Sequence, residues 1–357
     1  MSTPEPFSYE LPEERIAQRP ISPPEAAKML VVHRRSGEIE DRFFSDLPAL
    51  LPSGTRFVFN DTRVIPARLF GLLGGALGED APPSGAAIEI LLVQRLPGSG
   101  AGGEENASTW RCIGRPLKKI RKAACIWFSS ALVAEVLEGG ELESIVLRFR
   151  TQSDAPVEEV ILAHGCMPIP PYIRSGKGDE FDRTDYQTIF ADKPGSVAAP
   201  TASLHFSPLL VEKMKQQGFP LSFITLHVGT ASFQPILVNG ELKPPASESL
   251  EVPLSVTREI DETRRQGGKV VAVGTTVTRA LESAALGTSS GSTELFITPG
   301  HTFSWVDILV TNFHQPGTTH LLLVEAFIGR ELLQKVYHHA LKNDYRFLSY
   351  GDGMIVL

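Results

Sequence analysis

The stretch Phe57-Val58-Phe59-Asn60-Asp61-Thr62-Arg63 marks the point where an apolar strand ends in polar residues and the character of the sequence changes. Before it, residues 29–33 and 56–59 read as isolated strands. After it, as far as Phe149, short strand-like segments follow one another without a convincing helix. The sequence therefore predicts that a first domain is interrupted near residue 62 by a second one.

The second domain is predicted from six short strands that are separated by Gly, Pro and Ser. These are residues 64–72, 87–94, 109–113, 124–128, 132–137 and 145–150. Evenly spaced short strands of this kind are typical of a small antiparallel β-barrel. We predict an inserted β-barrel domain over residues 63–151.

The rest of the chain alternates strands with helices. Helices are expected at 157–164, 207–217, 255–266 and 276–285, and strands at 222–228, 269–273 and 307–311. Such alternation is typical of an α/β domain with largely parallel strands. We predict an α/β catalytic domain, open and barrel-like, that is discontinuous in sequence (1–62 and 152–357) because the small antiparallel β-barrel is inserted into it.

Composition sets broad limits. The chain has 357 residues, of which 42% are hydrophobic and 21% are charged, which is ordinary for a folded globular protein. Its net charge of −7 argues against an indiscriminate nucleic-acid binder, so a nucleic acid would need local basic patches. A polar N-terminus and short apolar runs predict a cytoplasmic protein with no membrane partner. Three scattered cysteines indicate neither a disulfide framework nor a metal site.

Several candidate site residues directly follow predicted strands, where side chains are exposed at the rim of the sheet but held rigidly. Asp61 and Arg63 are predicted to contact a ligand, whereas Asn60 alone is better explained by a structural turn. His227 follows the strand at 222–228, and Gly229 next to it would let a ligand approach the backbone.

Two further strand ends have the same character. Thr275, Thr276 and Arg279 begin a helix whose free N–H groups suit an anion, although plain capping of the helix explains the threonines equally well. The strand near 307–311 is flanked by Asp307 and is followed by Asn312 and His314.

Two other segments contribute candidates. Thr201 and His205 lie in a small, uncharged, proline-containing run that could let a flat ligand lie against backbone. Asp352 lies between two glycines near the end of the sequence, which suits a site or a simple turn.

The predicted barrel carries a basic cluster in an otherwise acidic protein. It consists of Arg111, Arg115, Lys118, Lys119, Arg121 and Lys122. Such a run is usually a solvated face, but it is also the best candidate for contacts to RNA phosphates. No GxGxxG or Walker motif supports nicotinamide or ATP chemistry, and the sequence predicts no metal.

Taken in order, nine segments resemble the S-adenosylmethionine:tRNA ribosyltransferase-isomerase family. They are residues 59–69, 170–174, 185–188, 197–206, 226–235, 272–283, 297–300, 307–319 and 345–354. The resemblance runs from about Tyr9 to the end of the sequence, and several long motifs in the same order make a chance match very improbable.

This resemblance implies an α/β domain with an inserted β-barrel, and a reaction. The ribosyl carbons of S-adenosylmethionine would be moved onto 7-aminomethyl-7-deazaguanine (preQ1) at the wobble position of a tRNA, giving epoxyqueuosine, adenine and methionine. S-adenosylmethionine would then be a consumed co-substrate and no cofactor is implied; we expect a monomer.

The reaction needs proton transfers and anionic groups near a sulfonium. Imidazoles suit proton transfer near neutral pH. The acid/base candidates are therefore His205, His227 and His314, and the carboxylate candidates are Asp61, Asp307 and Asp352. Thr275, Thr276 and Arg279 are candidates to hold the methionine carboxylate. We expect the histidines and carboxylates to converge on one cavity.

One position departs from the family pattern. Ala246-Ser247-Glu248 stands where members usually carry His-Ser-Glu. One alternative is therefore a non-catalytic RNA-binding relative that lost turnover through this change. A separate alternative is a nucleoside-processing enzyme that acts on a free base rather than on tRNA.

Overall fold

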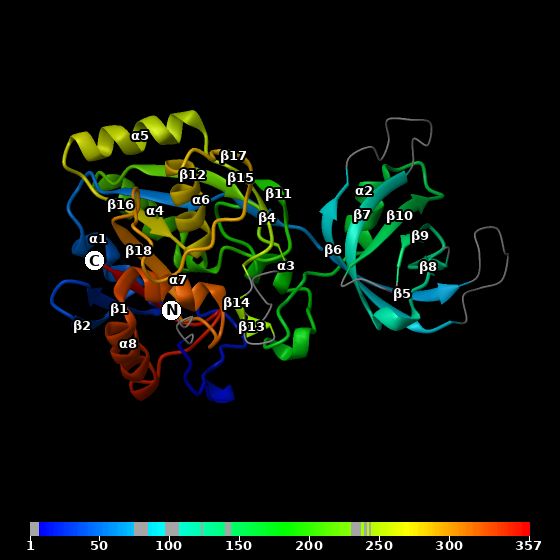
Figure 1. The fold of residues 1–357 in the computed structure, drawn as a ribbon, viewed down its shortest axis with the longest axis horizontal. Helices are drawn as coiled ribbons and strands as arrows, with labels where there is room; N and C mark the ends of the chain where they lie inside the picture. The colour runs from blue at the N-terminus through cyan, green and yellow to red at the C-terminus, as the bar shows by residue number, and fades with distance from the viewer. Residues whose placement is uncertain are drawn as a thin grey trace. The chain divides into compact units, whose positions relative to one another are not determined.

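The computed structural model describes residues 7–74, 85–96, 107–122, 124–139, 144–229, 237–238, 241–242 and 244–357. The chain divides into two compact units (Figure 1). Unit 1 comprises Met1–Arg63, Pro170–Lys177 and Thr184–Leu357, and unit 2 comprises Val64–Ile169 and Gly178–Arg183. Among the described residues, no helix is both long and apolar enough to cross a membrane.

Unit 1 is built on a nine-stranded sheet with the order β17-β15-β12-β3-β16-β18-β19-β1-β2. Its strands are β1 (Lys28–His33), β2 (Glu38–Phe43), β3 (Arg56–Asn60), β12 (Leu221–Leu226), β15 (Glu248–Glu251), β16 (Val270–Val273), β17 (Ser290–Thr293), β18 (Ile308–Asn312) and β19 (Gly353–Val356). The central strands β12, β3, β16 and β18 are parallel.

The outer strands of this sheet pair antiparallel, so the prediction of largely parallel strands is correct only for its centre. β19 runs antiparallel to β18, although it is parallel to β1, and β15, β17 and β2 also pair antiparallel with their neighbours. Two helices in succession, α7 (Thr319–Ile328) and α8 (Arg330–Lys342), connect β18 to β19. The first helix returns the chain to the edge of the sheet where β18 began, and the second brings it back to the edge where β18 ended. β19 therefore starts from that edge and runs in the direction opposite to β18.

Helices cover both faces of this sheet (Figure 1). The helices of unit 1 are α1 (Leu47–Leu50), α4 (Pro208–Gln216), α5 (Leu254–Arg265), α6 (Thr275–Ala285), α7 (Thr319–Ile328) and α8 (Arg330–Lys342), and the short helix α3 (Asp182–Asp185) is divided between the two units. Val270 and Ala272 of β16 pack in one apolar core with α5, α6, α7 and α8, whereas Val271 and Val273 pack in another with α4. Alternate residues of a strand point to opposite faces, which explains why β16 is apolar throughout.

Short elements complete unit 1 and the connections. They are η1 (Glu13–Arg15), η2 (Pro24–Ala26), η3 (Phe44–Asp46), η5 (Arg174–Gly176), η6 (Thr201–His205), β4 (Thr62–Val64), β11 (Lys193–Ser196), β13 (Leu237–Val238) and β14 (Glu241–Leu242). β4 pairs with β11, and β13 pairs with β14.

Unit 2 is a closed antiparallel barrel with the order β10-β7-β6-β5-β8-β9. Its elements are β5 (Arg68–Gly74), β6 (Ala87–Arg95), β7 (Ala107–Arg115), η4 (Leu117–Lys119), β8 (Cys125–Trp127), β9 (Leu132–Glu138), β10 (Ile145–Thr151) and α2 (Val157–His164). The predicted α/β class with an antiparallel β-barrel is therefore confirmed.

Two details of the barrel differ from the prediction. The single strand expected at 64–72 is divided into β4 and β5, and Pro66 between them lacks the N–H that a continuous ladder needs. The helix α2 packs against β10 and β7, so unit 2 extends past the predicted boundary at residue 151.

Candidate active site

A cavity of about 90 Å³ lies in unit 1 at the carboxyl ends of β12, β16 and β18. Its wall includes Val228, Gly274–Thr276, Thr311–Gln315, Thr318 and His320 from strand ends and helix starts. The loop residues Ala198–Ala202, Leu348 and Ser349 and the side chains of Tyr172 and Tyr186 close it. Open α/β sheets bind ligands at the carboxyl ends of their strands, so this is the candidate active site.

The start of α6 supplies two hydroxyls to this wall. Gly274 has φ of +101°, a conformation that favours glycine, and it turns the chain from β16 into α6. Thr275 and Thr276 follow, and both line the cavity and a narrower one beside it. Thr276 is 8% exposed, and its Oγ1 has no hydrogen-bond partner among the residues that the structure describes. A buried hydroxyl without a partner is a donor available to a ligand.

Arg279 lies one turn further along α6 and lines the narrower cavity. Its guanidinium forms an ion pair with Glu248, and its Nε donates to the carbonyl of Leu295 at 3.1 Å. Its Nη2 is buried with no partner in the described part of the chain. Glu248 also accepts the N–H of Gly229 at 3.0 Å, so this backbone group of Gly229 is already occupied by protein.

His314 and His320 form a stacked pair in the cavity wall, with ring centroids 5.2 Å apart and planes inclined by 20°. The Nε2 of His314 lies 2.7 Å from the Oγ1 of Thr311. Burial, and secondarily the neighbouring His320, lowers the pKa of His314 well below its ordinary value. Burial also lowers the pKa of His320 to about 4, with Arg279 adding to the effect. Both imidazoles are therefore neutral near pH 7.

His320 was missed by the sequence analysis. It is the second residue of α7 and lies just beyond the segment 307–319 that resembles the family, and no strand end or glycine directly marks it. Only its packing against His314 and Arg279 brings it to the cavity.

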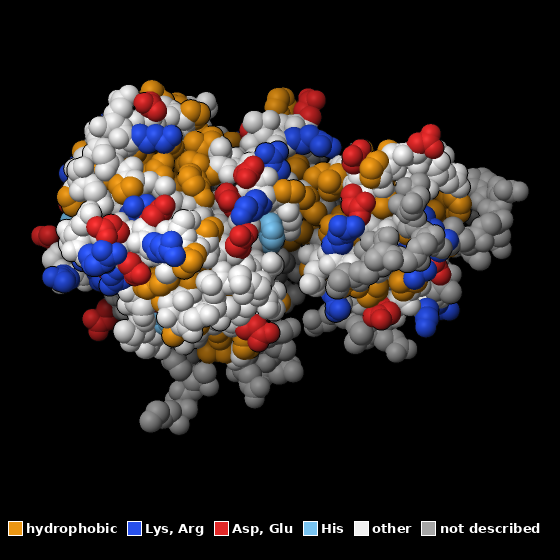
Figure 2. All heavy atoms as spheres, turned by 90° about the horizontal axis from the view of Figure 1, so that it is seen from above, with side chains coloured by type: hydrophobic (Ala, Val, Ile, Leu, Met, Phe, Trp, Pro, Cys, Tyr) orange, Lys and Arg blue, Asp and Glu red, His pale blue; other side chains and the backbone are white. Residues whose placement is uncertain are grey.

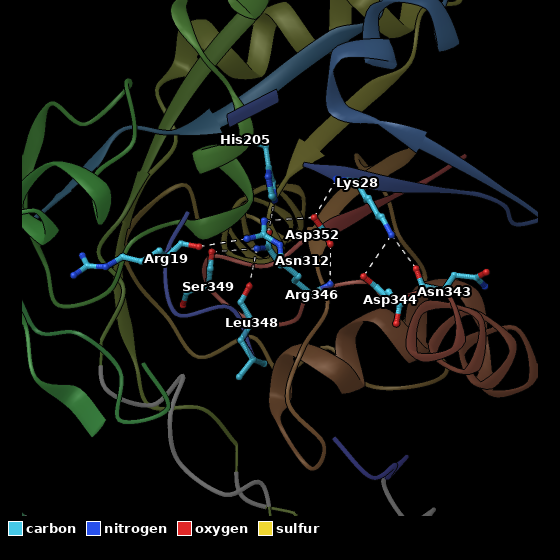
Figure 3. A network of polar contacts seen from close by, with 10 residues as sticks. All are labelled: Arg19, Lys28, His205, Asn312, Asn343, Asp344, Arg346, Leu348, Ser349 and Asp352. Carbon is cyan, nitrogen blue, oxygen red and sulfur yellow. Dashed lines mark hydrogen bonds and ion pairs between the residues drawn. The ribbon is translucent and has the colours of Figure 1, made fainter. Parts of the chain in front are cut away.

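His205 supports the cavity from behind and is not one of the described residues that line it. Figure 3 shows its ring pointing at Asn312, whose Oδ1 lies 3.3 Å from the Nε2 of His205. The other face of the imidazole stacks on Phe44, with centroids 3.9 Å apart. Burial lowers the pKa of His205 to about 3, although the bond to Asn312 opposes this shift.

Asn312 links His205 to two residues of the cavity wall. Its Nδ2 donates to the carbonyls of Leu348 at 2.9 Å and Ser349 at 3.3 Å, and both of these residues line the cavity. The hydroxyl of Ser349 bonds in turn to that of Tyr172 at 2.9 Å. His205 and Asn312 therefore hold a wall segment in place.

Asp352 anchors the same segment from its far end (Figure 3). Its carboxylate accepts the backbone N–H of Lys28 at 3.0 Å and that of Arg346 at 2.7 Å, and the Arg346 guanidinium lies 3.6 Å away. Asp352 is 2% exposed, and burial raises its pKa against the lowering effect of these partners. The geometry is that of a structural carboxylate that fastens the loop to β1.

His227 and Asp61 form a second cluster next to Val228 of the cavity wall. The Nδ1 of His227 lies 2.8 Å from the Oγ1 of Thr62, and Asp61 accepts the hydroxyl of Thr225 at 2.6 Å. Burial lowers the pKa of His227, while the charge of Asp61 opposes the shift. Asn60 accepts the N–H of Thr62 at 3.1 Å and bonds to the backbone of Leu226, so its structural interpretation is confirmed.

Of the six histidines and carboxylates that were expected to converge on one cavity, only His314 is among the described residues that line it. His205, His227, Asp61 and Asp352 lie behind or beside its wall, and the expectation is wrong for Asp307. This residue precedes β18, and its carboxylate accepts the N–H of Val270 at the beginning of β16. Because β16 and β18 are parallel, Asp307 lies at the amino edge of the sheet, opposite to the cavity. Arg63 is exposed and donates to the carbonyl of Ala191, while Thr201 lines the cavity.

The basic cluster lies on β7, on η4 and in the turn after it. All six of its side chains are exposed, and within the described ranges none of them forms an ion pair. Over the same ranges, no group of three or more His, Cys, Asp or Glu is arranged to hold a metal ion.

Fold and site together define an α/β protein with a ligand cavity at its strand ends and a separate β-barrel. The family model described as queuosine biosynthesis protein matches residues 4–356. The chain belongs to this family, so the predicted resemblance is confirmed.

Curated relatives match almost the whole chain. A Halothermothrix orenii protein named S-adenosylmethionine:tRNA ribosyltransferase-isomerase is 42% identical over 99% of both chains, and a Thermotoga maritima protein of the same name is 40% identical over 98% of both. The crystal structure of the Thermotoga maritima S-adenosylmethionine tRNA ribosyltransferase matches with a TM-score of 0.54 and 34% identity, covering 98% of this chain and 99% of that one.

Proposed function

We propose that this chain transfers and isomerises the ribosyl part of S-adenosylmethionine onto preQ1 at the wobble position of a tRNA, as a step of queuosine biosynthesis. The products are the epoxyqueuosine-bearing tRNA, adenine and methionine. The observation that carries this proposal is the roughly 40% identity, over nearly the whole chain, to relatives that are named for this activity. S-adenosylmethionine is consumed as a co-substrate, and no further cofactor takes part.

The start of α6 is the proposed binding site for the methionine carboxylate of S-adenosylmethionine. Thr276 Oγ1 and Arg279 Nη2 are both buried donors that lack a partner in the described structure, and both face the narrower cavity. The N–H groups at the beginning of α6 add a favourable dipole for an anion. Glu248 forms an ion pair with Arg279. This ion pair offsets part of the positive charge of Arg279 and holds its guanidinium in position.

His314 is the proposed proton-transfer residue of the cavity. A neutral imidazole can accept a proton from the sugar carbon beside the sulfonium, whose positive charge makes that proton acidic. The contact with Thr311 and the stacking on His320 fix its ring. His227 with Asp61 is the proposed second acid/base group.

The other candidates have positioning roles in this proposal. His205, Asn312 and Asp352 hold the segment that carries Leu348 and Ser349. Thr201 and Val228 shape the cavity wall, whereas Gly229 bonds to Glu248. Arg63 is exposed and is proposed to contact the RNA.

The tRNA is proposed to bind through the basic cluster of the barrel, since these exposed side chains have no acidic partner in the described structure. We propose that the protein acts as a cytoplasmic monomer.

A non-catalytic relative is the less favoured reading. Ala246 is exposed and is not among the described residues that line either cavity. The missing imidazole therefore leaves the polar lining intact.

The test is incubation of the protein with S-adenosylmethionine and a tRNA that carries preQ1, followed by mass spectrometry of adenine and of the modified nucleoside. Adenine and epoxyqueuosine in equal amounts support the proposal. RNA binding without adenine release would indicate the non-catalytic relative, and adenine release without tRNA would indicate an enzyme of free bases.

A matched pair of variants tests the role of His314. His314→Ala should lower the rate of adenine release by at least about 100-fold, the usual contribution of a general acid or base. His338→Ala, which removes an exposed imidazole of α8, should leave the rate unchanged. Equal rates for the two variants would remove His314 from the mechanism.

A further inference from the structure

The outer face of the barrel carries apolar side chains that the packing of unit 2 does not use. Phe70 is 58% exposed and Leu72 is 39% exposed, and both lie on β5. Residues two apart on a strand point to the same side, so Phe70 and Leu72 share this face. Leu72 is directly opposite Trp127 of β8, which is partly exposed. The three side chains form one strip, the Phe70 strip.

Basic side chains border the Phe70 strip. Phe70 pairs with Glu89 of β6, and Glu89 pairs with Arg115 of β7, so these three residues form one row on the outside of the barrel. Neighbouring strands are about 4.8 Å apart, which places the backbone of Arg115 roughly 10 Å from that of Phe70. The carboxylate of Glu89 is already engaged by Arg68 at 3.2 Å.

The chain continues from Arg115 into the rest of the basic cluster. The segment with Lys118, Lys119, Arg121 and Lys122 runs from the end of β7 to the start of β8, the strand that pairs with β5 beside Leu72. On the face shown in Figure 2, hydrophobic side chains lie among basic and acidic ones on the barrel at the right of the view.

We propose that the Phe70 strip is a base-stacking surface for unpaired nucleotides of the RNA substrate, and that the basic cluster holds the phosphates of the same nucleotides. This inference rests on the proposed function. Single-stranded RNA presents a flat apolar base next to a negative phosphate, and the barrel presents an exposed aromatic side chain next to unpaired cations. The nucleotides of an anticodon loop fit this surface, because paired bases in a stem cannot reach an aromatic side chain.

The charges of the barrel disfavour a second copy of the chain as the occupant. In a two-fold symmetric contact each patch faces itself, so the basic cluster would lie against its own copy. An anionic partner removes this repulsion.

The experiment measures the affinity of the full-length protein for an unmodified anticodon stem-loop RNA and for a blunt RNA duplex with the same number of nucleotides. Phe70→Ala should weaken binding of the stem-loop by roughly 5- to 100-fold, the usual effect of removing one stacking aromatic residue. It should leave duplex binding and the salt dependence of binding unchanged, because no charge is removed. Phe70→Trp should retain or increase the affinity for the stem-loop.

Phe43→Ala is the matched control, since Phe43 is a 49% exposed aromatic side chain on β2 of unit 1, and it should change neither affinity. Thermal unfolding of each variant checks that the barrel remains folded. Equal stem-loop affinity of wild type and Phe70→Ala would overturn the inference, as would equal losses for stem-loop and duplex. A wild-type dimer that Phe70→Ala dissociates without loss of RNA affinity would assign the strip to a second copy. Adenine release by the wild-type protein is measured separately, so the proposed function can stand while the stacking inference fails.

Discussion

The unpartnered hydroxyl of Thr276 leads to a prediction in which stability and substrate binding change in opposite directions. Thr276→Val replaces the hydroxyl by a methyl group of nearly the same size, and both residues are β-branched. In the described structure Thr276 Oγ1 is buried without a hydrogen bond. Burying such a group costs about 1–3 kcal/mol, so its removal should leave the free energy of unfolding unchanged or raise it by about 1 kcal/mol.

The same hydroxyl is proposed to bind the carboxylate of S-adenosylmethionine. A hydrogen bond to a charged group contributes about 1.5–3 kcal/mol, which corresponds to a roughly 10- to 150-fold rise in KM for S-adenosylmethionine. The kcat at saturating S-adenosylmethionine should change little, because the carboxylate is far from the reacting carbons and is bound equally in ground and transition states. Initial rates of adenine release and chemical denaturation measure the two effects.

Thr278→Val in the same helix is the control. Thr278 is fully buried, and its Oγ1 donates to the carbonyl of Gly274 at 3.1 Å. Loss of this bond should lower the stability by about 1 kcal/mol and leave the KM unchanged. The reasoning is refuted if Thr276→Val destabilises the protein as much as Thr278→Val does, or if its KM for S-adenosylmethionine equals that of the wild type.

Three further predictions concern the buried His205, the ion pair of Glu248 with Arg279, and the basic cluster. The pKa of His205 is about 3 in the folded protein and about 6.5 in the unfolded chain, so lowering the pH from 7 to 5 should reduce the free energy of unfolding by about 2 kcal/mol. His205→Gln should not show this loss, which denaturant titrations at both pH values would measure. An equal pH dependence of the two proteins would contradict the prediction. Glu248→Ala removes the carboxylate partner of the Arg279 guanidinium and of the Gly229 N–H, and among the described residues it leaves the guanidinium only the carbonyl of Leu295 as an acceptor. It should destabilise the protein by about 3–5 kcal/mol, whereas an unchanged melting temperature would mean that water replaces the carboxylate. Joint replacement of Lys118, Lys119, Arg121 and Lys122 by Ala should weaken tRNA binding and reduce the salt slope by about 0.7–0.9 for each lost phosphate contact; an unaltered slope would show that the cluster is only solvated surface.

Local patterns in the sequence were enough to predict most elements. The helix at 157–164 is observed as α2 (Val157–His164), and the strand at 269–273 is observed as β16 (Val270–Val273). These elements depend on hydrophobic periodicity and on turn residues, which act over a few positions. The division of the expected strand at 64–72 follows from Pro66, a signal that was present in the sequence but outweighed by the apolar run around it.

The candidate site was predicted as a set of strand ends, together with the segments around Thr201 and Asp352. The strand direction decides which edge of the sheet each residue occupies, and this depends on pairing between segments far apart in the chain. Asp307 and His314 are seven positions apart, yet β18 places them at opposite edges.

The sequence by itself determined the two-part architecture, the family and some residues of the cavity wall, among them Thr276, Asn312 and His314, because apolar periodicity and residue order are properties of the chain alone. Only the tertiary structure decided which polar groups are left without a protein partner. Thr276 and Thr278 are both threonines of one helix, but Thr276 lines a cavity and its Oγ1 has no partner in the described structure, while Thr278 bonds to the carbonyl of Gly274. Burial and partners are set by the packing of distant segments, and therefore no local pattern encodes them.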